Sequence, residues 1–206
     1  MMLADLGATV IKVERPGTGD DTRSWGPPYA EDGKSTYFHS VNRNKNSVAL
    51  DLKNEADRRK ARTIAMAADV VIENFRPGVM DRLGLGWETL KARNPNLVMC
   101  AITGYGQDGP MALAAGHDIN YIGYAGMLAQ NTDDDGRPVL PNLQIGDLLG
   151  GALTAPGSLP GCYLFPAGRY KLHAARSNLA APGDCVTRCS CRNGCRAPEL
   201  CGAGGS

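Results

Sequence analysis

The chain has 206 residues, of which 43% are hydrophobic, so it is long enough for one domain with a buried core. Its formal net charge of +1 gives no electrostatic case for a nucleic-acid partner or an acidic membrane surface. We find neither an apolar run of membrane-spanning length nor a signal sequence in "MMLADLGATVIKVERPG", so we expect a cytoplasmic protein.

The first predicted elements are a short helix and two strands. Residues 1–8 are typical of a helix end that stops near Gly7. The β-branched run "ATVIKVE" (8–14) predicts a buried strand, and "SVALDL" (47–52) predicts a second one. Between them, residues 20–46 are rich in turn-forming residues and predict a loop.

A longer helix and two further strands follow. Helical spacing predicts a helix over 54–68, with Asn54 as its N-cap. "DVVIENF" (69–75) and "LVMCAITGYG" (97–106) predict strands, and the helix between them is interrupted by glycines. This last helix covers 79–95, with its breaks at Gly84 and Gly86.

The alternation of strands and helices indicates an α/β fold, a parallel Rossmann-like sheet with flanking helices. Ligands of such sheets bind beyond the carboxyl ends of the strands. Three turn-rich segments, "ERPG", "ENFRPG" and "TGYGQDGP", each follow a predicted strand. We therefore expect a binding site at this end of the sheet.

The composition changes sharply after residue 155. "QIGDLLGGALTA" (144–155) predicts a helix start with Asp147 near its N-terminus, and Pro156 ends that helix. The rest of the chain holds six of the seven cysteines, eight glycines, six basic residues and only two acidic ones. We therefore expect a domain over 1–155 and an irregular, Cys/Gly/Pro-rich tail over 156–206.

The spacing of the tail cysteines fits a structural zinc site only in part, because paired C-x₂₋₄-C knuckles are missing. A secreted disulfide framework conflicts with a cytoplasmic first part. We expect no metal site and a disordered tail. A shifted reading frame after about residue 155 is our hypothesis for its origin, since a GC-rich gene read out of frame gives this mixture of residues.

The glycine turns match neither a dinucleotide-binding nor a P-loop fingerprint. Four basic residues near strand ends could bind phosphates, although any one of them alone is more often a solvated surface charge. They are Arg15, Lys53, Arg76 and Arg82.

Two residues are candidates for acid–base or nucleophilic chemistry. His117, in "GHDINY", is either a proton-moving base or a satisfied loop histidine. Asp147 is either an acid that complements a helix dipole or a nucleophile or general acid/base. They are 30 residues apart, so only the fold can bring them together.

Several motifs occur in the order typical of one family. They are "LADLGATVIKVERPGTGDDTRSWGPP", "NRNKNSVALDLK", "ADVVIENFRPGVMDRLGLGWETL", "NPNLVMCAITGYGQDGP", "GHDINY" and "IGDLLGG". Over residues 2–155 the chain resembles the family III CoA-transferases, the CaiB/BaiF family, which includes α-methylacyl-CoA racemases.

The resemblance implies roles for both candidates. Asp147 matches the aspartate that attacks an acyl-CoA thioester in the transferases and exchanges the α-proton in the racemases. His117 matches the histidine of the racemases, which removes or returns that proton on the opposite face. CoA enters as part of the substrate, and no other cofactor is implied.

The resemblance also implies a CoA site. Arg15 in "ERPG" and Asn74, Phe75 and Arg76 in "ENFRPG" match CoA-contacting positions of the family. Phe75 would pack near the adenine, and the two arginines would meet phosphates.

Three departures from the family pattern matter. The segment 20–46 resembles the transferase branch, whereas "GHDINY" resembles the racemase branch. Family members begin with a further strand and glycine turn before "LADLG", and they continue past "GGALTA" into a second domain. They form interlocked dimers. We therefore expect a full-length parent that is an interlocked homodimer, and a fragment over 1–206 without substantial activity.

Three functions remain open. The first is racemisation or epimerisation of 2-methylacyl-CoA thioesters through His117 and Asp147. The second is CoA transfer between carboxylic acids through an Asp147 acyl anhydride and CoA thioester. The third is a non-catalytic, truncated CoA-binding remnant.

Overall fold

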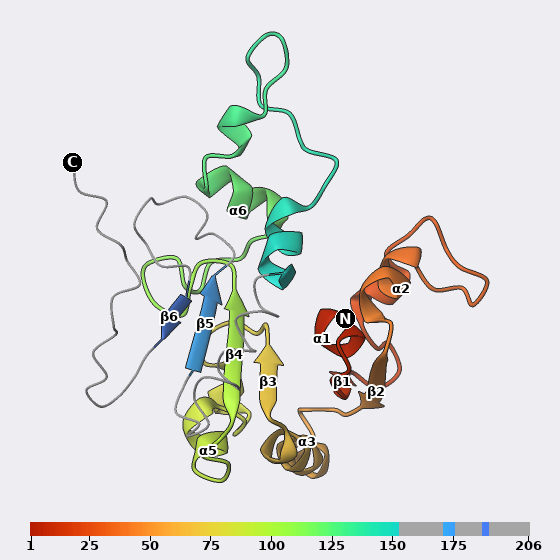
Figure 1. Cartoon of the computed structure of the whole chain (residues 1–206), viewed down its shortest axis with the longest axis vertical. Helices are drawn as coiled ribbons and strands as arrows, with labels where there is room; N and C mark the ends of the chain where they lie inside the picture. Colours follow the sequence, from red (N-terminus) through yellow and green to blue (C-terminus); the bar gives the residue numbers. More distant parts are fainter. Residues whose placement is uncertain (153–170, 176–186, 190–206) are drawn as a thin grey trace.

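The computed structural model describes residues 1–152, 171–175 and 187–189. Its larger sheet has the strand order β3-β4-β5-β6 (Figure 1). The strands are β3 (Val70–Glu73), β4 (Val98–Thr103), β5 (Lys171–Ala175) and β6 (Thr187–Cys189). β3, β4 and β5 run parallel, and β6 pairs antiparallel with β5. The expected α/β fold with a parallel sheet is confirmed.

The first two strands form a sheet of their own. β1 (Val10–Glu14) pairs in parallel with β2 (Lys45–Ala49), with Val13 opposite Val48. The sequence predicts both strands but not this separation. Within the described residues no strand lies between β1 and β3 to join the two sheets into one.

Two short helices lie in the segment that was expected to be a loop, 20–46. They are the 3-10 helix η1 (Asp21–Ser24) and α2 (Thr36–Asn42); a third short helix, α1 (Met2–Asp5), ends just before Gly7, as predicted. Ser35 caps α2, because its hydroxyl accepts a hydrogen bond from the backbone N–H of Tyr37 at 3.1 Å. Short capped helices of this kind carry too few residues for a helical hydrophobic pattern.

The predicted helix over 54–68 is α3 (Glu55–Ala67), and its predicted cap is confirmed. Asn54 Oδ1 accepts hydrogen bonds from the N–H groups of Ala56 and Asp57. The glycine-interrupted helix is two helices, α4 (Val79–Arg82) and α5 (Trp87–Lys91). Gly84 separates them in the left-handed region, at φ +66°, which explains the break.

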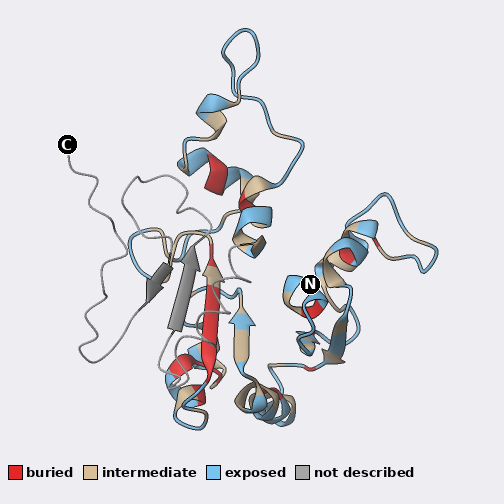
Figure 2. Cartoon of the chain, in the orientation of Figure 1, coloured by how far each residue is buried: buried red, intermediate tan, exposed pale blue. Residues whose placement is uncertain are grey.

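The core lies around β4 and the helices at its amino end (Figure 2). Val98, Met99, Cys100 and Ala101 are at most 2% exposed. A buried apolar cluster joins the end of β2 to α3, α5 and the start of β4. Its members are Leu50, Ala61, Leu85, Leu90 and Leu97.

Two strands, β5 and β6, lie in the segment that was expected to be irregular. The remainder of 156–206, with Pro156 and most of the tail cysteines, lies outside the described residues. In the part of the chain that is described, no helix is long and apolar enough to cross a membrane. Those residues also contain no group of three His, Cys, Asp or Glu that could hold a metal ion.

A buried carboxylate orders the loop after β1. Glu14 accepts hydrogen bonds from Arg23 Nε at 2.9 Å and Nη2 at 3.0 Å, and from the backbone N–H of Asp20 at 2.9 Å. The Arg23 guanidinium also lies over the Phe38 ring, 4.1 Å from its centroid. These bonds, Arg23 foremost, outweigh burial and lower the pKa of Glu14 to about 2.

We expect Glu14→Gln to flatten the acid side of the stability profile. The carboxylate is ionised more readily in the folded chain, so its contribution is complete above its ordinary pKa of 4.5 and is lost as pH falls toward about 2. Urea unfolding at pH values from 2 to 7 measures this slope. The exposed Glu31→Gln is the matched control, and an unchanged slope in Glu14→Gln would contradict the network.

Candidate functional site

The candidate catalytic residues lie at the carboxyl end of the larger sheet. The arrowheads of β3, β4 and β5 point toward α6 (Asp118–Tyr124) and toward a helix that begins at residue 145 and is described to residue 152 (Figure 1). This is the end at which parallel α/β sheets bind ligands. The sequence-based expectation for the place of the site therefore agrees with the fold.

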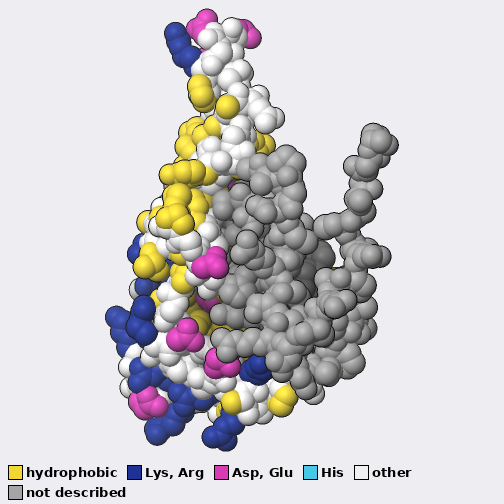
Figure 3. Space-filling view, turned by 90° about the vertical axis from the view of Figure 1, so that its left-hand side faces the viewer, with side chains coloured by type: hydrophobic (Ala, Val, Ile, Leu, Met, Phe, Trp, Pro, Cys, Tyr) yellow, Lys and Arg dark blue, Asp and Glu magenta, His cyan; other side chains and the backbone are white. Residues whose placement is uncertain are grey.

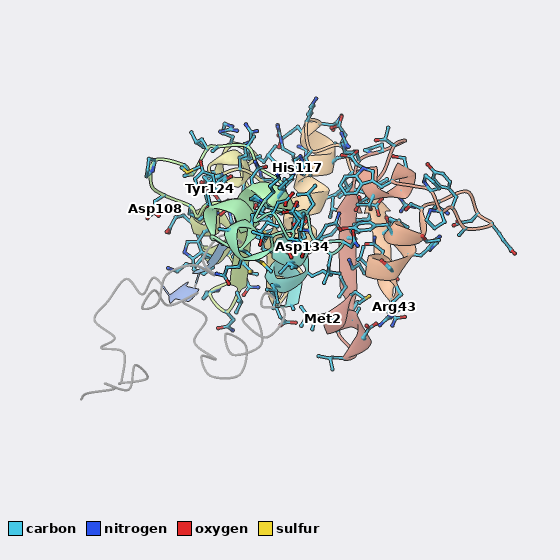
Figure 4. All side chains as sticks on the ribbon, turned by 90° about the horizontal axis from the view of Figure 1, so that it is seen from above. Met2, Arg43, Asp108, His117, Tyr124 and Asp134 are labelled. Carbon is cyan, nitrogen blue, oxygen red and sulfur yellow. The ribbon has the colours of Figure 1, made fainter. Side chains whose placement is uncertain are left out.

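His117 is the N-cap of α6, in extended backbone. Its backbone N–H donates to Asn120 Oδ1 at 2.9 Å, so the side chain of Asn120 closes the first turn of the helix. The His117 side chain is exposed. Figure 4 looks down onto this end of the molecule and shows His117 and Tyr124 on it.

Tyr121 fixes α6 against the loop that follows β4. It is buried, its hydroxyl donates to the Gly116 carbonyl at 2.5 Å, and its ring meets Tyr105 edge-on at 5.3 Å. A Cβ on Gly104 would lie 2.3 Å from the Tyr121 ring, and one on Gly116 would lie 2.8 Å from it. The glycines therefore allow the close approach that places His117.

Asp147 is the third residue of the helix that begins at residue 145, and it is half-buried. Its backbone N–H donates to Asp118 Oδ1 at 3.0 Å. Asp118 directly follows His117, so the fold brings the segments of the two candidate catalytic residues into contact. The sequence alone could not show this.

The four predicted CoA-contacting residues are exposed at strand ends. Arg15 directly follows β1 and is ion-paired with Asp21. Asn74, Phe75 and Arg76 directly follow β3, and the Phe75 N–H donates to Glu73 Oε2 at 2.8 Å. Arg15 and the segment after β3 thus belong to different sheets, and no hydrogen bond or ion pair of the described residues joins them.

Two buried polar atoms near the end of β4 have no hydrogen-bond partner within the described part of the chain. They are Thr103 Oγ1 and Gln107 Nε2. Thr103 ends β4 and Gln107 lies in the loop that leads toward α6. Unsatisfied buried polar groups are uncommon, so this edge of the sheet has hydrogen-bonding capacity that a substrate could use.

Apolar side chains gather above the sheet, over α6 and the segment that follows it (Figure 3). The most exposed are Leu113, Tyr124 and Leu140, at 66–67%. Lysine and arginine side chains gather at the opposite end of the same view. The candidate catalytic end of the chain is therefore the more apolar one.

Sequence reasoning missed Asp118 and Tyr121. The motif "GHDINY" drew attention to its histidine alone, and the helix α6 that starts inside it was not predicted. The available signal was an aspartate followed two residues later by asparagine, both typical of helix starts. Nothing in the sequence indicated that Asp118 bonds to a residue 29 positions later.

We expect Gly104→Ala to destabilise the fold and Gly123→Ala to leave it intact. The added methyl at residue 104 meets the Tyr121 ring at 2.3 Å, whereas at residue 123 its nearest neighbour is Leu128 at 3.5 Å. Overpacking of this kind costs about 1–3 kcal/mol. Urea unfolding of both variants checks the difference, and equal stabilities would contradict the packing described here.

Known proteins similar to this chain are CoA-transferases. Succinyl-CoA:glutarate CoA-transferase of Mus musculus is 48% identical over 151 residues, which cover 73% of this chain and 34% of that protein. Acetyl-CoA:oxalate CoA-transferase of Acetobacter aceti is 43% identical over 163 residues, 79% of this chain and 41% of that protein. The chain thus spans about two fifths or less of the length of these relatives.

Solved structures give the same result. The crystal structure of a CaiB/BaiF family protein from Brucella suis matches with a TM-score of 0.79 at 38% identity, covering 86% of this chain and 48% of that one. The sequence model of CoA-transferase family III matches residues 1–163. This chain therefore belongs to CoA-transferase family III.

Proposed function

We propose that this chain carries the nucleophile of an enzyme that moves CoA between carboxylic acids, and that Asp147 is that nucleophile. The relatives described above are named as CoA-transferases acting on succinyl-CoA with glutarate and on acetyl-CoA with oxalate. Their names favour transfer over racemisation, which the sequence alone had placed first.

The proposed chemistry is two acyl exchanges at one carboxylate. An Asp147 oxygen attacks the thioester carbonyl of the donor, the C–S bond breaks, and CoA leaves as a thiolate while a mixed anhydride forms. The thiolate then attacks the aspartyl carbonyl and displaces the donor acid, which leaves an aspartyl-CoA thioester. The acceptor carboxylate repeats these steps in reverse and departs as the new CoA thioester.

The observation that carries this proposal is the setting of Asp147. It lies in the first turn of a helix at the carboxyl end of a parallel sheet, and its backbone is bonded to Asp118 at 3.0 Å. The first N–H groups of a helix have no acceptor within the helix. Such groups can stabilise the oxyanion that forms when the thioester carbonyl is attacked.

The CoA portion of the substrate would bind across the strand ends. Arg15 would exchange Asp21 for a phosphate, Arg76 would meet a second phosphate, and Phe75 would pack against the adenine beside Asn74. We also propose that the full-length protein is an interlocked homodimer acting in the cytoplasm on acyl-CoA thioesters, without a metal or a further cofactor.

Racemisation is the second candidate, and one observation favours it. His117 directly precedes Asp118, whose carboxylate contacts the Asp147 backbone. A histidine and an aspartate held on adjoining segments could face an α-carbon from two sides. His117 would then take or return the α-proton.

Hydroxylamine trapping separates the two candidates. With succinyl-CoA and glutarate, we expect a hydroxamate at Asp147 by peptide mass spectrometry, because hydroxylamine captures the anhydride or thioester. Asp147→Asn should abolish the label and His117→Ala should retain it. Deuterium exchange at the α-carbon of 2-methylacyl-CoA that is lost in His117→Ala, without any hydroxamate, would overturn transfer in favour of racemisation. Neither signal, together with retained CoA binding, would identify a non-catalytic CoA-binding remnant.

The proposed CoA site has its own test. We expect Phe75→Ala to weaken CoA binding roughly tenfold, since an aromatic contact with a base is worth about 1–3 kcal/mol. Leu113→Ala removes a comparably exposed apolar side chain on another segment and should have no effect. Isothermal titration with CoA measures both, and equal affinities would contradict the assignment of Phe75.

A further inference from the structure

We propose that Asp118 is a positioning residue for Asp147: one carboxylate that starts α6 also caps the helix that carries the candidate nucleophile. This inference rests on the proposed function only in taking Asp147 as the reacting group. The link between the two residues is a property of the fold and can be tested without turnover.

The first step concerns the helix that begins at residue 145. Its first intrahelical bond runs from the Leu148 N–H to the Gln144 carbonyl at 3.0 Å, so Gln144 is the N-cap. Glutamine is not among the favoured N-cap residues, whose side chains accept from the second or third N–H of the helix. Here the third N–H, that of Asp147, donates to Asp118 Oδ1 at 3.0 Å instead. Asp118 therefore takes the place of the missing local cap.

The second step is that Asp118 is itself held. It is the first residue of α6 and is half-buried. The helix is anchored by buried Tyr121 and Ile122, and Asn120 closes its first turn. The carboxylate therefore approaches the Asp147 backbone from a fixed element and not from a loose loop.

The third step is the close approach of the two helices. A Cβ on buried Gly146 would lie 3.0 Å from Asp118 Oδ1, 3.6 Å from Ile122 and 3.7 Å from Tyr121. The contact thus requires a residue with almost no side chain directly before Asp147. This spacing is independent of the hydrogen bond and supports the same arrangement.

The charge of Asp118 suits this position. It lies in the first turn of α6 and at the first turn of the following helix, and a negative charge is favourable at both starts. Loss of the carboxylate would leave the Asp147 N–H without this acceptor and would loosen the turn on which Asp147 stands. A displacement of about 1 Å at a reacting group can cost up to ~10²-fold in rate.

The direct test follows the Asp147 amide by NMR in the full chain. With Asp118→Ala we expect an upfield shift of this amide proton and hydrogen exchange roughly tenfold faster, as for a lost hydrogen bond of about 1–1.5 kcal/mol. Asp118→Asn keeps an acceptor oxygen and should restore most of the protection. Glu88→Ala, which removes another acid from the first turn of a helix, is the matched control. An unchanged Asp147 amide in Asp118→Ala would overturn the proposal.

A titration keeps the proposal testable if Asp118→Ala does not fold. In the Asp147→Asn chain the residue cannot titrate, so the amide shift at position 147 should follow the protonation of Asp118 between neutral and acid pH. The side-chain carbonyl carbon of Asp118 reports that protonation in the same sample. An amide at position 147 that does not move with it would contradict the link.

A kinetic measurement then connects the link to chemistry. We expect Asp118→Ala to lower the rate of acyl-Asp147 formation about tenfold or more with little change in KM, and Asp118→Asn to recover it. If the unchanged chain forms no acyl-Asp147, the proposed function fails while the amide measurements still decide the role of Asp118. Equal rates in Asp118→Ala and the unchanged chain, with a disturbed amide, would confine Asp118 to a structural role and overturn its positioning role.

Discussion

The burial of β4 is the constraint on which the arrangement depends. β3 and β5 pair with its two edges, and from Val98 to Ala101 at most 2% of each residue is exposed. A strand that is paired on both sides and covered on both faces has to present its polar chemistry where it ends. β4 ends at Thr103, and the glycine-rich loop that leaves it leads to α6 and to His117.

Carboxylates organise the chain beyond the strand ends in two places. Glu14 takes the Asp20 N–H and the Arg23 guanidinium and so shapes the loop after β1. Asp118 takes the Asp147 N–H and so joins two helix starts beyond β4. In both cases the carboxylate accepts a backbone N–H that has no partner in regular secondary structure, which is the need that the chain meets in each place. The difference lies in exposure, because Glu14 is buried and Asp118 is half-buried at the candidate site.

Local signals predicted much of the fold, because they depend on neighbours in sequence. The cap at Asn54, the break at Gly84 and the helix start before Asp147 all follow from residues a few positions apart. α2 and α6 were missed since a helix of seven residues shows little of the helical period. The bond from Asp147 to Asp118 and the packing of Gly104 on Tyr121 join residues far apart in sequence, so no local pattern could reveal them. Family resemblance indicated Asp147 and His117, but only the fold shows that their segments touch.

The separation of the two sheets has a consequence for handling the protein. Among the described residues, β1 pairs only with β2 and β3 only with β4, so each keeps one open edge. These strands also leave apolar side chains in water: Ile11 is 48% exposed, Val13 38% and Ile72 46%. An open edge with apolar neighbours is a template onto which a strand from another molecule can be added. The solubility of this chain is therefore governed by how well those edges are shielded, and self-association would rise with concentration even where the core around β4 stays intact.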